Sequence, residues 1–350
     1  MRSSTRILCL LVTAAFFLLV PLLARDAGEE TRPAARAAAP CPIVTPAPVA
    51  ARSPHGRVGI YLTAYGARRE DVLTGALKAR QAGAIDTLVI NVKDNHGHIS
   101  YASQVPLARS LGAATGLLDF ARILPILRAQ GFYLIARQVV FNDPLLAGHL
   151  GYANGWVPAD HATAVAYNLA VAEEVAALGF DEIQFDYIRY ADGGGLAAGY
   201  EQRYQAINAF LAKVHAALGA EITLSADLFG RVMWDWNAKR MDPIGQSLED
   251  MGRWLDVVSP MVYPSHYTEQ KYKDGPYLVV KDALLSGRKR TATAIRPFLQ
   301  AFDLAVPSGM TLEAYIAAQI RAAKDHGADG YLFWEPSNDY RALYRALGVE

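Results

Sequence analysis

Eight short apolar runs, rich in β-branched residues, recur between residues 57 and 340. Segments with helical periodicity separate them, and four of these are followed within two residues by a glycine of the kind that ends helices. Eight strands that alternate with helices over about 290 residues predict an α/β fold, a single-domain (β/α)8 TIM barrel. The predicted strands are 58–61, 87–92, 133–140, 182–185, 222–226, 257–262, 294–299 and 331–334. The clearest predicted helices are 71–82, 117–129, 164–178 and 312–326.

A doubly wound open sheet is the main alternative for such an alternation, and it calls for a glycine-rich phosphate loop after an early strand. No G-x-G-x-x-G or G-x-x-x-x-G-K motif occurs in the sequence, which favours the barrel. The chain has 350 residues, of which 52% are hydrophobic, enough for a large core. Its 34 basic and 34 acidic residues leave no basic field, which argues against nucleic acid as a partner.

The N-terminus has the pattern of an export signal. A short basic start precedes an almost entirely apolar run over residues 7–23. We expect residues 1–24 to be a signal peptide or an uncleaved membrane anchor, because a run of about 17 residues suits either. Both place the rest of the chain outside the cytoplasm, as a periplasmic, cell-surface or secreted protein. Residues 25–56 are rich in alanine and proline and predict a linker, so the barrel is expected over 57–350.

Carboxylates follow three of the predicted strands: Asp186 the fourth, Asp227 the fifth and Glu335 the eighth. Barrel enzymes carry their catalytic groups at these C-terminal strand ends. A pair of carboxyl groups can act as general acid and as base or nucleophile when a glycosidic bond is broken. These three are the predicted catalytic residues, with Asp227 the preferred partner of Asp186.

Each of these carboxylates also has a purely structural interpretation. Asp186 could form an ion pair at the barrel rim with Arg137 or Arg189. Asp227 could cap the turn that follows its strand, and Glu335 could be an ordinary loop residue. The sequence leaves these alternatives open.

Aromatic, basic and amide side chains gather at the same predicted strand ends. Aromatic faces can stack on pyranose rings, and an arginine beside a carboxylate keeps it ionised. Asp94 has an alternative role as the ion-pair partner of the adjacent Lys93. The predicted substrate-binding residues are Asp94, Arg137, Tyr187, Arg189, Tyr263, His266, Tyr267, Gln300 and Trp334.

A series of motifs runs in order from about residue 57 to residue 340. It comprises 92–94 with Gly97, 135–137 with 141–144, 179–189, 225–230, 244–246, 259–267 and 296–300. Together they resemble a bacterial family of glycoside hydrolase-type barrels, and the segments 179–189 and 259–267 are the most specific. The resemblance implies a barrel of the glycosidase superfamily and implies no particular substrate.

The chain is more distantly similar to chitinase-type barrels, whose fourth strand carries the motif D-G-x-D-x-D-x-E. Asp181, Gln184 and Asp186 fall on the three aspartate positions, with Gln184 replacing one of them. Ile188 stands where that family has its catalytic glutamate. Asp186 must therefore work with a carboxylate from another strand. Met261 and Tyr263 match the M-x-Y of the sixth strand.

These observations predict a glycoside hydrolase that cleaves an extracytoplasmic or cell-envelope polysaccharide by carboxylate acid/base catalysis, with no cofactor and no metal. The first alternative is a non-catalytic carbohydrate-binding barrel, motivated by Ile188. The second is a metal-dependent polysaccharide hydrolase or deacetylase that would use Asp94, His96 and His266. Their spacing does not match H-x-x-x-H or H-E-x-x-H, which makes it the weaker alternative.

Overall fold

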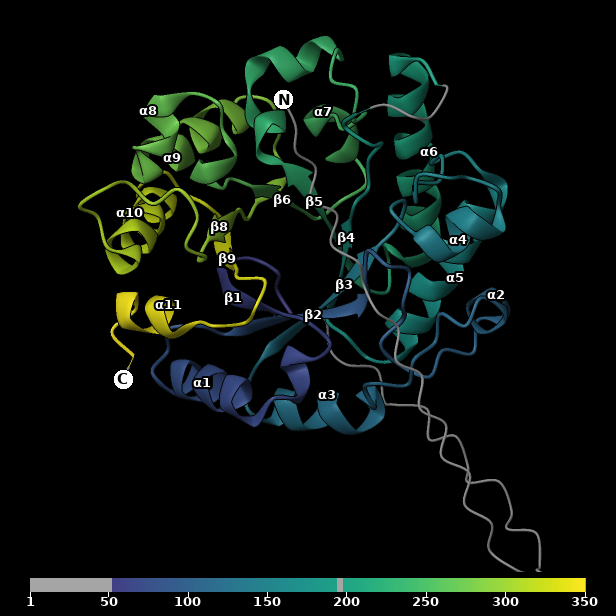
Figure 1. The fold of residues 1–350 in the computed structure, drawn as a ribbon, viewed down its shortest axis with the longest axis horizontal. Helices are drawn as coiled ribbons and strands as arrows, with labels where there is room; N and C mark the ends of the chain where they lie inside the picture. The colour runs from purple at the N-terminus through teal and green to yellow at the C-terminus, as the bar shows by residue number, and fades with distance from the viewer. Residues whose placement is uncertain (1–51, 194–197, 350) are drawn as a thin grey trace, which may run out of the picture. The chain divides into compact units, whose positions relative to one another are not determined.

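The computed structural model describes residues 52–193 and 198–349. All strand pairs are parallel, and the pairing of β5 with β6 closes the sheet into a barrel. Helices surround this barrel on the outside (Figure 1). The strands are β1 (Arg57–Leu62), β2 (Thr87–Lys93), β3 (Tyr133–Val139), β4 (Glu182–Asp186), β5 (Thr223–Phe229), β6 (Val257–Met261), β7 (Ala294–Ile295), β8 (Phe298–Gln300) and β9 (Gly330–Trp334).

The predicted (β/α)8 barrel is confirmed, with one strand interrupted. The single strand predicted over 294–299 is divided into β7 and β8. The break falls at Arg296 and Pro297, and a proline has no N–H to donate to the ladder. Because β6 pairs with both pieces, they share one of the eight strand positions.

The four clearest predicted helices are present with shifts of a few residues. The largest shift is at α3, which begins at Phe120 instead of 117 because Asp119 caps it by accepting a hydrogen bond from the Arg122 N–H. The helices of six or more residues are α1 (Glu70–Gln81), α3 (Phe120–Ala129), α4 (Pro144–His149), α5 (Ala162–Ala177), α6 (Tyr200–Leu218), α9 (Pro276–Gly287), α10 (Leu312–Asp325) and α11 (Arg341–Ala346). The shorter helices are α2 (Pro106–Ser110), α7 (Leu248–Met251) and α8 (Gln270–Lys273).

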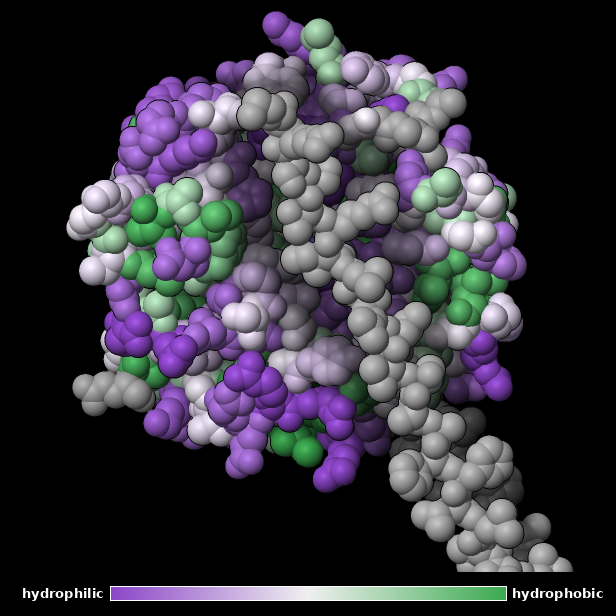
Figure 2. Space-filling model, in the orientation of Figure 1, coloured by the Kyte–Doolittle hydropathy of each residue, from purple (hydrophilic) through white to green (hydrophobic). Residues whose placement is uncertain are grey.

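The helical layer presents a mainly hydrophilic surface to solvent. On the face shown in Figure 2, hydrophilic residues cover most of the rim, and hydrophobic residues form separate patches, for example over α10 and near α2. None of the helices in the two described ranges is both long enough and apolar enough to span a membrane. The predicted signal or anchor and most of the predicted linker, residues 1–51, lie outside the described residues.

The strands are buried on both faces, so their side chains divide between two cores. Every residue of β2 and β3 is buried. Side chains alternate along a strand, so Tyr133 and Ile135 point into the barrel while Leu134 and Ala136 face the helices. The inner cluster consists of Tyr61, Val89, Tyr133, Ile135, Tyr263, Phe298 and Leu332.

Strand β4 places three polar side chains inside the barrel. Ile183 and Phe185 belong to the outer core, so Glu182, Gln184 and Asp186 point inward. Gln184 Nε2 donates to the Ser259 hydroxyl at 3.0 Å in the middle of the barrel. Glu182 lies nearer the N-terminal end and Asp186 at the C-terminal end. Strand β4 therefore carries a carboxylate to the mouth where barrel enzymes act.

Lys93 forms its ion pair with Asp143 at 2.7 Å and not with its neighbour Asp94. Both side chains are fully buried, and Asp143 also caps α4 by accepting from the Leu146 N–H. Gly97 packs against this pair, since a Cβ there would lie 2.3 Å from Asp143 Oδ1. The motif around Lys93 and Gly97 thus has a structural role in anchoring the loops after β2 and β3.

Candidate active site

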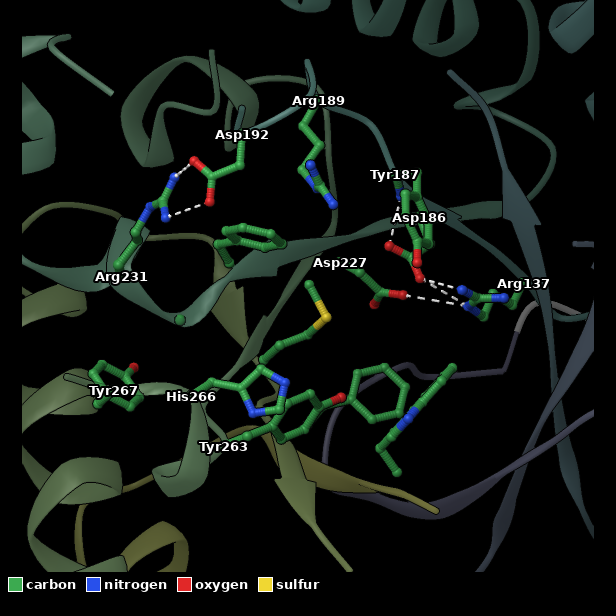
Figure 3. Close-up of a pocket in the computed structure, with 15 residues that line it drawn as sticks. Arg137, Asp186, Tyr187, Arg189, Asp192, Asp227, Arg231, Tyr263, His266 and Tyr267 are labelled. Carbon is green, nitrogen blue, oxygen red and sulfur yellow. Dashed lines mark hydrogen bonds and ion pairs between the residues drawn. The ribbon is translucent and has the colours of Figure 1, made fainter. Parts of the chain in front are cut away.

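A cavity of about 490 Å³ opens at the C-terminal ends of the strands. Figure 3 shows the side chains of its lining residues, among which Asp186, Asp227 and Arg137 form a cluster. The lining residues are Arg137, Asp186, Tyr187, Arg189, Asp192, Asp227, Phe229, Gly230, Arg231, Met261, Tyr263, His266, Tyr267, Phe298 and Trp334.

Asp186 is the last residue of β4 and is held by Arg137 of the neighbouring β3. Arg137 donates to Asp186 Oδ2 from Nε at 2.9 Å and also from Nη2. The other carboxylate oxygen, Oδ1, accepts from the backbone N–H of Tyr187 at 2.5 Å. Tyr187 has φ +50°, a left-handed conformation that is uncommon for tyrosine and is often found at functional sites. Asp186 is therefore fixed as a buried carboxylate facing the cavity.

Asp227 lies beside Asp186 on the adjacent strand β5 and has a different environment. Its Oδ2 is 3.9 Å from Arg137 Nε, and its Oδ1 has no hydrogen-bond partner among the described residues. Burial raises the pKa of the Asp227 carboxyl well above its ordinary value, Asp186 raises it further, and Arg137 opposes both. Two neighbouring carboxyl groups thus differ: one is bound by a guanidinium, and the other favours the protonated form.

This arrangement predicts that Asp186→Asn will lower the pKa of Asp227. The substitution removes the neighbouring negative charge and leaves the Arg137 guanidinium in place. Carbon-13 NMR titration of the aspartate carboxyl signals measures the shift. Asp192→Asn is the matched control, because that lining carboxylate is bound by Arg231 at 2.6 Å. An unchanged Asp227 pKa in Asp186→Asn would contradict the coupling.

Aromatic rings form part of the cavity wall. Trp334 stacks on Tyr61 with ring centroids 4.0 Å apart, and the Arg137 guanidinium lies 5.1 Å from the Trp334 ring. The hydroxyls of Tyr263 and Tyr267 are buried and have no hydrogen-bond partner among the described residues. Buried polar groups normally have partners, so two unsatisfied hydroxyls beside the cavity are unusual.

Seven of the nine predicted substrate-binding residues line the cavity, as do Asp186 and Asp227. Asp94 and Gln300 do not: Asp94 accepts from the backbone N–H groups of His96 and His98, and Gln300 bridges the loops after β6 and β8. The predicted catalytic Glu335 is also absent from the lining. Its carboxylate accepts from the Ser337 hydroxyl at 2.8 Å and the Asp339 N–H at 2.6 Å, so it stabilises a turn.

Six lining residues were not predicted: Asp192, Phe229, Gly230, Arg231, Met261 and Phe298. Their common signal is position, since they lie at strand ends or in the segments that directly follow β4 and β5. Gly230 has a specific reason to be glycine, because a Cβ there would lie 2.4 Å from the Tyr267 hydroxyl oxygen. A prediction based on position at the strand ends would have included these residues. A prediction based on residue type did not.

The two alternatives raised by the sequence can be compared with this geometry. Ile188 is fully buried in the outer core, so β4 offers no second acid to the cavity at that position. Residues 52–193 and 198–349 contain no group of three or more His, Cys, Asp or Glu side chains placed to hold a metal ion. Asp94, His96 and His266 are thus not brought together as a ligand set.

A closed parallel barrel with carboxylates and aromatic rings at its C-terminal mouth defines a TIM-barrel protein of the glycosidase type. The chain belongs to the family described as "Putative glycosyl hydrolase domain", whose model matches residues 59–340. The family resemblance of the strand motifs is thereby confirmed. No curated protein sequence matches the chain significantly.

Solved glycoside hydrolase structures share this fold at low sequence identity. The PgaB (BpsB) glycoside hydrolase domain from Bordetella bronchiseptica is 14% identical, with a TM-score of 0.63 over 83% of this chain and 98% of that chain. An endo-β-1,4-mannanase from Thermotoga petrophila is 11% identical, with a TM-score of 0.57 over 80% and 68%. A class V chitinase from Nicotiana tobaccum is 11% identical, with a TM-score of 0.51 over 84% and 98%.

Proposed function

We propose that this protein hydrolyses glycosidic bonds in a polysaccharide, with Asp227 as the general acid and Asp186 as the partner carboxylate. The observation that carries the proposal is the pair itself. Asp186 and Asp227 lie on adjacent strands against one arginine, and burial and the neighbouring Asp186 raise the pKa of Asp227. Glycoside hydrolysis requires such a pair, in which one carboxyl group is a proton donor with a raised pKa and the other is a carboxylate.

In the proposed reaction, the Asp227 carboxyl transfers its proton to the glycosidic oxygen as the bond to the anomeric carbon breaks. Asp186 either attacks the anomeric carbon, giving a glycosyl–enzyme ester that water later hydrolyses, or takes a proton from the attacking water. The first route retains and the second inverts the anomeric configuration. Proton NMR of the first-formed product separates the two routes.

The outer surface around the mouth supports a polymeric substrate. Of the seven exposed large hydrophobic side chains in the described ranges, five lie in segments that follow strands at the mouth. These are Tyr65, Tyr200, Trp236, Met241 and Leu304. The exposed aromatic faces among them suit stacking on sugar units beyond the cavity. The basic and apolar N-terminal sequence supports an extracytoplasmic location for such a substrate.

The direct test is product formation from a panel of cell-envelope and exopolysaccharides, followed as new reducing ends. We expect product from the wild-type protein and none above background from Asp186→Asn with its fold intact by circular dichroism. Wild-type activity in Asp186→Asn would refute the assignment. Binding of a polysaccharide by both proteins with product from neither would instead favour a non-catalytic carbohydrate-binding barrel.

Trp334→Ala is expected to weaken oligosaccharide binding about 10- to 100-fold, because it removes an aromatic face at the cavity wall. Isothermal titration calorimetry with a bound fragment from the panel measures the loss. Trp334→Phe is the matched control: it keeps an aromatic face against Tyr61 and should retain most of the affinity. Equal affinity in Trp334→Ala and the wild type would exclude a stacking role for this ring.

A further inference from the structure

The cavity is lined by three arginines, and two of them are neutralised by carboxylates. Arg137 binds Asp186. Arg231 binds Asp192 at 2.6 Å and also the buried Asp242 at 2.8 Å. Arg189 has no carboxylate within ion-pair distance among the described residues. Its Nη1 donates to the backbone carbonyl of Tyr190 at 3.0 Å.

Aromatic rings hold Arg189 at the cavity wall. Its guanidinium lies 4.3 Å from the ring centroid of Phe229, 4.7 Å from that of Trp156 and 5.1 Å from that of Tyr187. Such contacts stabilise a cation and fix its orientation, but they use the faces of the rings and leave the guanidinium N–H groups available. Figure 3 shows the side chain pointing into the cavity from the loop after β4.

Among the described residues, Arg189 is the lining arginine to which no carboxylate binds directly. Burial lowers the pKa of Arg189 and Asp186 opposes this shift, yet an arginine remains protonated at neutral pH. Burial also lowers the pKa of His266, so that ring is neutral there. Carboxylates bind the other two lining arginines directly, Asp186 on Arg137 and both Asp192 and Asp242 on Arg231. A half-buried cation at a cavity wall without a directly bound carboxylate favours an anionic ligand there.

We propose that Arg189 binds the carboxylate of an acidic sugar, so that the substrate is a polysaccharide containing uronic acids or similarly carboxylated units. This inference rests on the proposed function, whose substrate class it names. The planar guanidinium fork matches a carboxylate through two parallel hydrogen bonds. A neutral sugar would leave this partly desolvated cation without a counter-charge. Because Arg189 and Asp186 line the same cavity, we place the acidic sugar near the bond that is cleaved.

Calorimetric binding in the Asp227→Asn background, which leaves the ligand uncleaved, tests the proposal. The probes are short oligomers of mannuronate, guluronate, galacturonate and glucuronate, each paired with its carboxyl-reduced neutral counterpart. We expect at least one acidic oligomer to bind about 10- to 100-fold more tightly than its reduced form. Adding Arg189→Gln should abolish this preference, and Arg189→Lys should restore part of it. Arg231→Gln, at a lining arginine that is already paired, should keep the preference.

The proposal is overturned if no acidic oligomer binds better than its reduced form, or if Arg189→Gln weakens both forms equally. Sulfated neutral oligomers form a third arm, and an Arg189-dependent preference for sulfate alone would also overturn the carboxylate assignment. The two proposals fail separately. An Arg189-dependent preference without hydrolysis of the matching polymer would refute the glycosidase and keep the acidic subsite. Asp227-dependent hydrolysis of neutral polysaccharides alone would keep the glycosidase and refute the acidic subsite.

Discussion

Asp227→Asn is expected to lower kcat/KM about 10²- to 10⁴-fold, the contribution usual for a general acid. Asparagine keeps the size of the side chain but has no proton to transfer to the glycosidic oxygen. Initial rates of reducing-end release at saturating and limiting substrate give kcat and kcat/KM. A kcat/KM within threefold of the wild-type value would rule out Asp227 as the acid. Asp192→Asn is the matched control, because Asp192 also lines the cavity but is bound by Arg231.

The same variant should gain stability relative to the wild type as the pH rises. The folded-state pKa of Asp227 is raised above its unfolded value of about 3.9, so the folded protein binds the extra proton between the two values. Wild-type stability therefore falls as the pH rises from about 4 through the folded-state pKa, and Asp227→Asn lacks this loss. Urea unfolding at a series of pH values measures the difference. If the stability of Asp227→Asn relative to the wild type stays constant or falls as the pH rises, burial of the Asp227 carboxylate is not destabilising.

The barrel was predictable because its evidence is local and repeated. Each buried strand leaves a short apolar run, and glycines mark several of the helix ends. The position of Asp186 and Asp227 at the cavity was predictable for the same reason, since carboxylates at C-terminal strand ends are recognisable once the strands are placed. Strand β5 extends to Phe229, three residues beyond the predicted end, so Asp227 lies within the strand.

The predicted residues that lie outside the cavity are placed there by turns and long-range contacts, which have no local signature. Glu335 also follows a strand, but its backbone folds so that the carboxylate reaches Ser337 and Asp339. Gln300 follows the same positional pattern and is instead fully buried between loops. Arg137 was predicted to bind substrate, while its contacts show that it first holds Asp186 in place. Residue type and position are visible in a sequence, but the hydrogen-bond partner is not.

Breaking the charged pair at the opposite end of the barrel, by removing one partner, should have the largest effect on stability. Arg296 and Glu182 are fully buried, and Arg296 donates to both oxygens of the Glu182 carboxylate. Glu182 also accepts from the hydroxyls of Tyr133 and Ser225. Arg296→Met is expected to lower the free energy of unfolding by about 3–5 kcal/mol, because it leaves a carboxylate buried with only these two neutral donors.

The physical reason for this loss is the isolated charge, and the double variant Arg296→Met with Glu182→Leu tests that reason. Replacing a whole buried pair by apolar side chains is often close to neutral, so the double variant should be more stable than Arg296→Met alone. Urea unfolding gives each free energy. Arg345→Met is the matched control, because it breaks an ion pair with Glu313 in which Arg345 is exposed, a kind worth about 0–1 kcal/mol. Two outcomes would contradict mutual charge compensation in the pair. In the first, Arg296→Met lowers the free energy of unfolding no more than Arg345→Met does. In the second, the double variant loses as much as Arg296→Met and Glu182→Leu lose together.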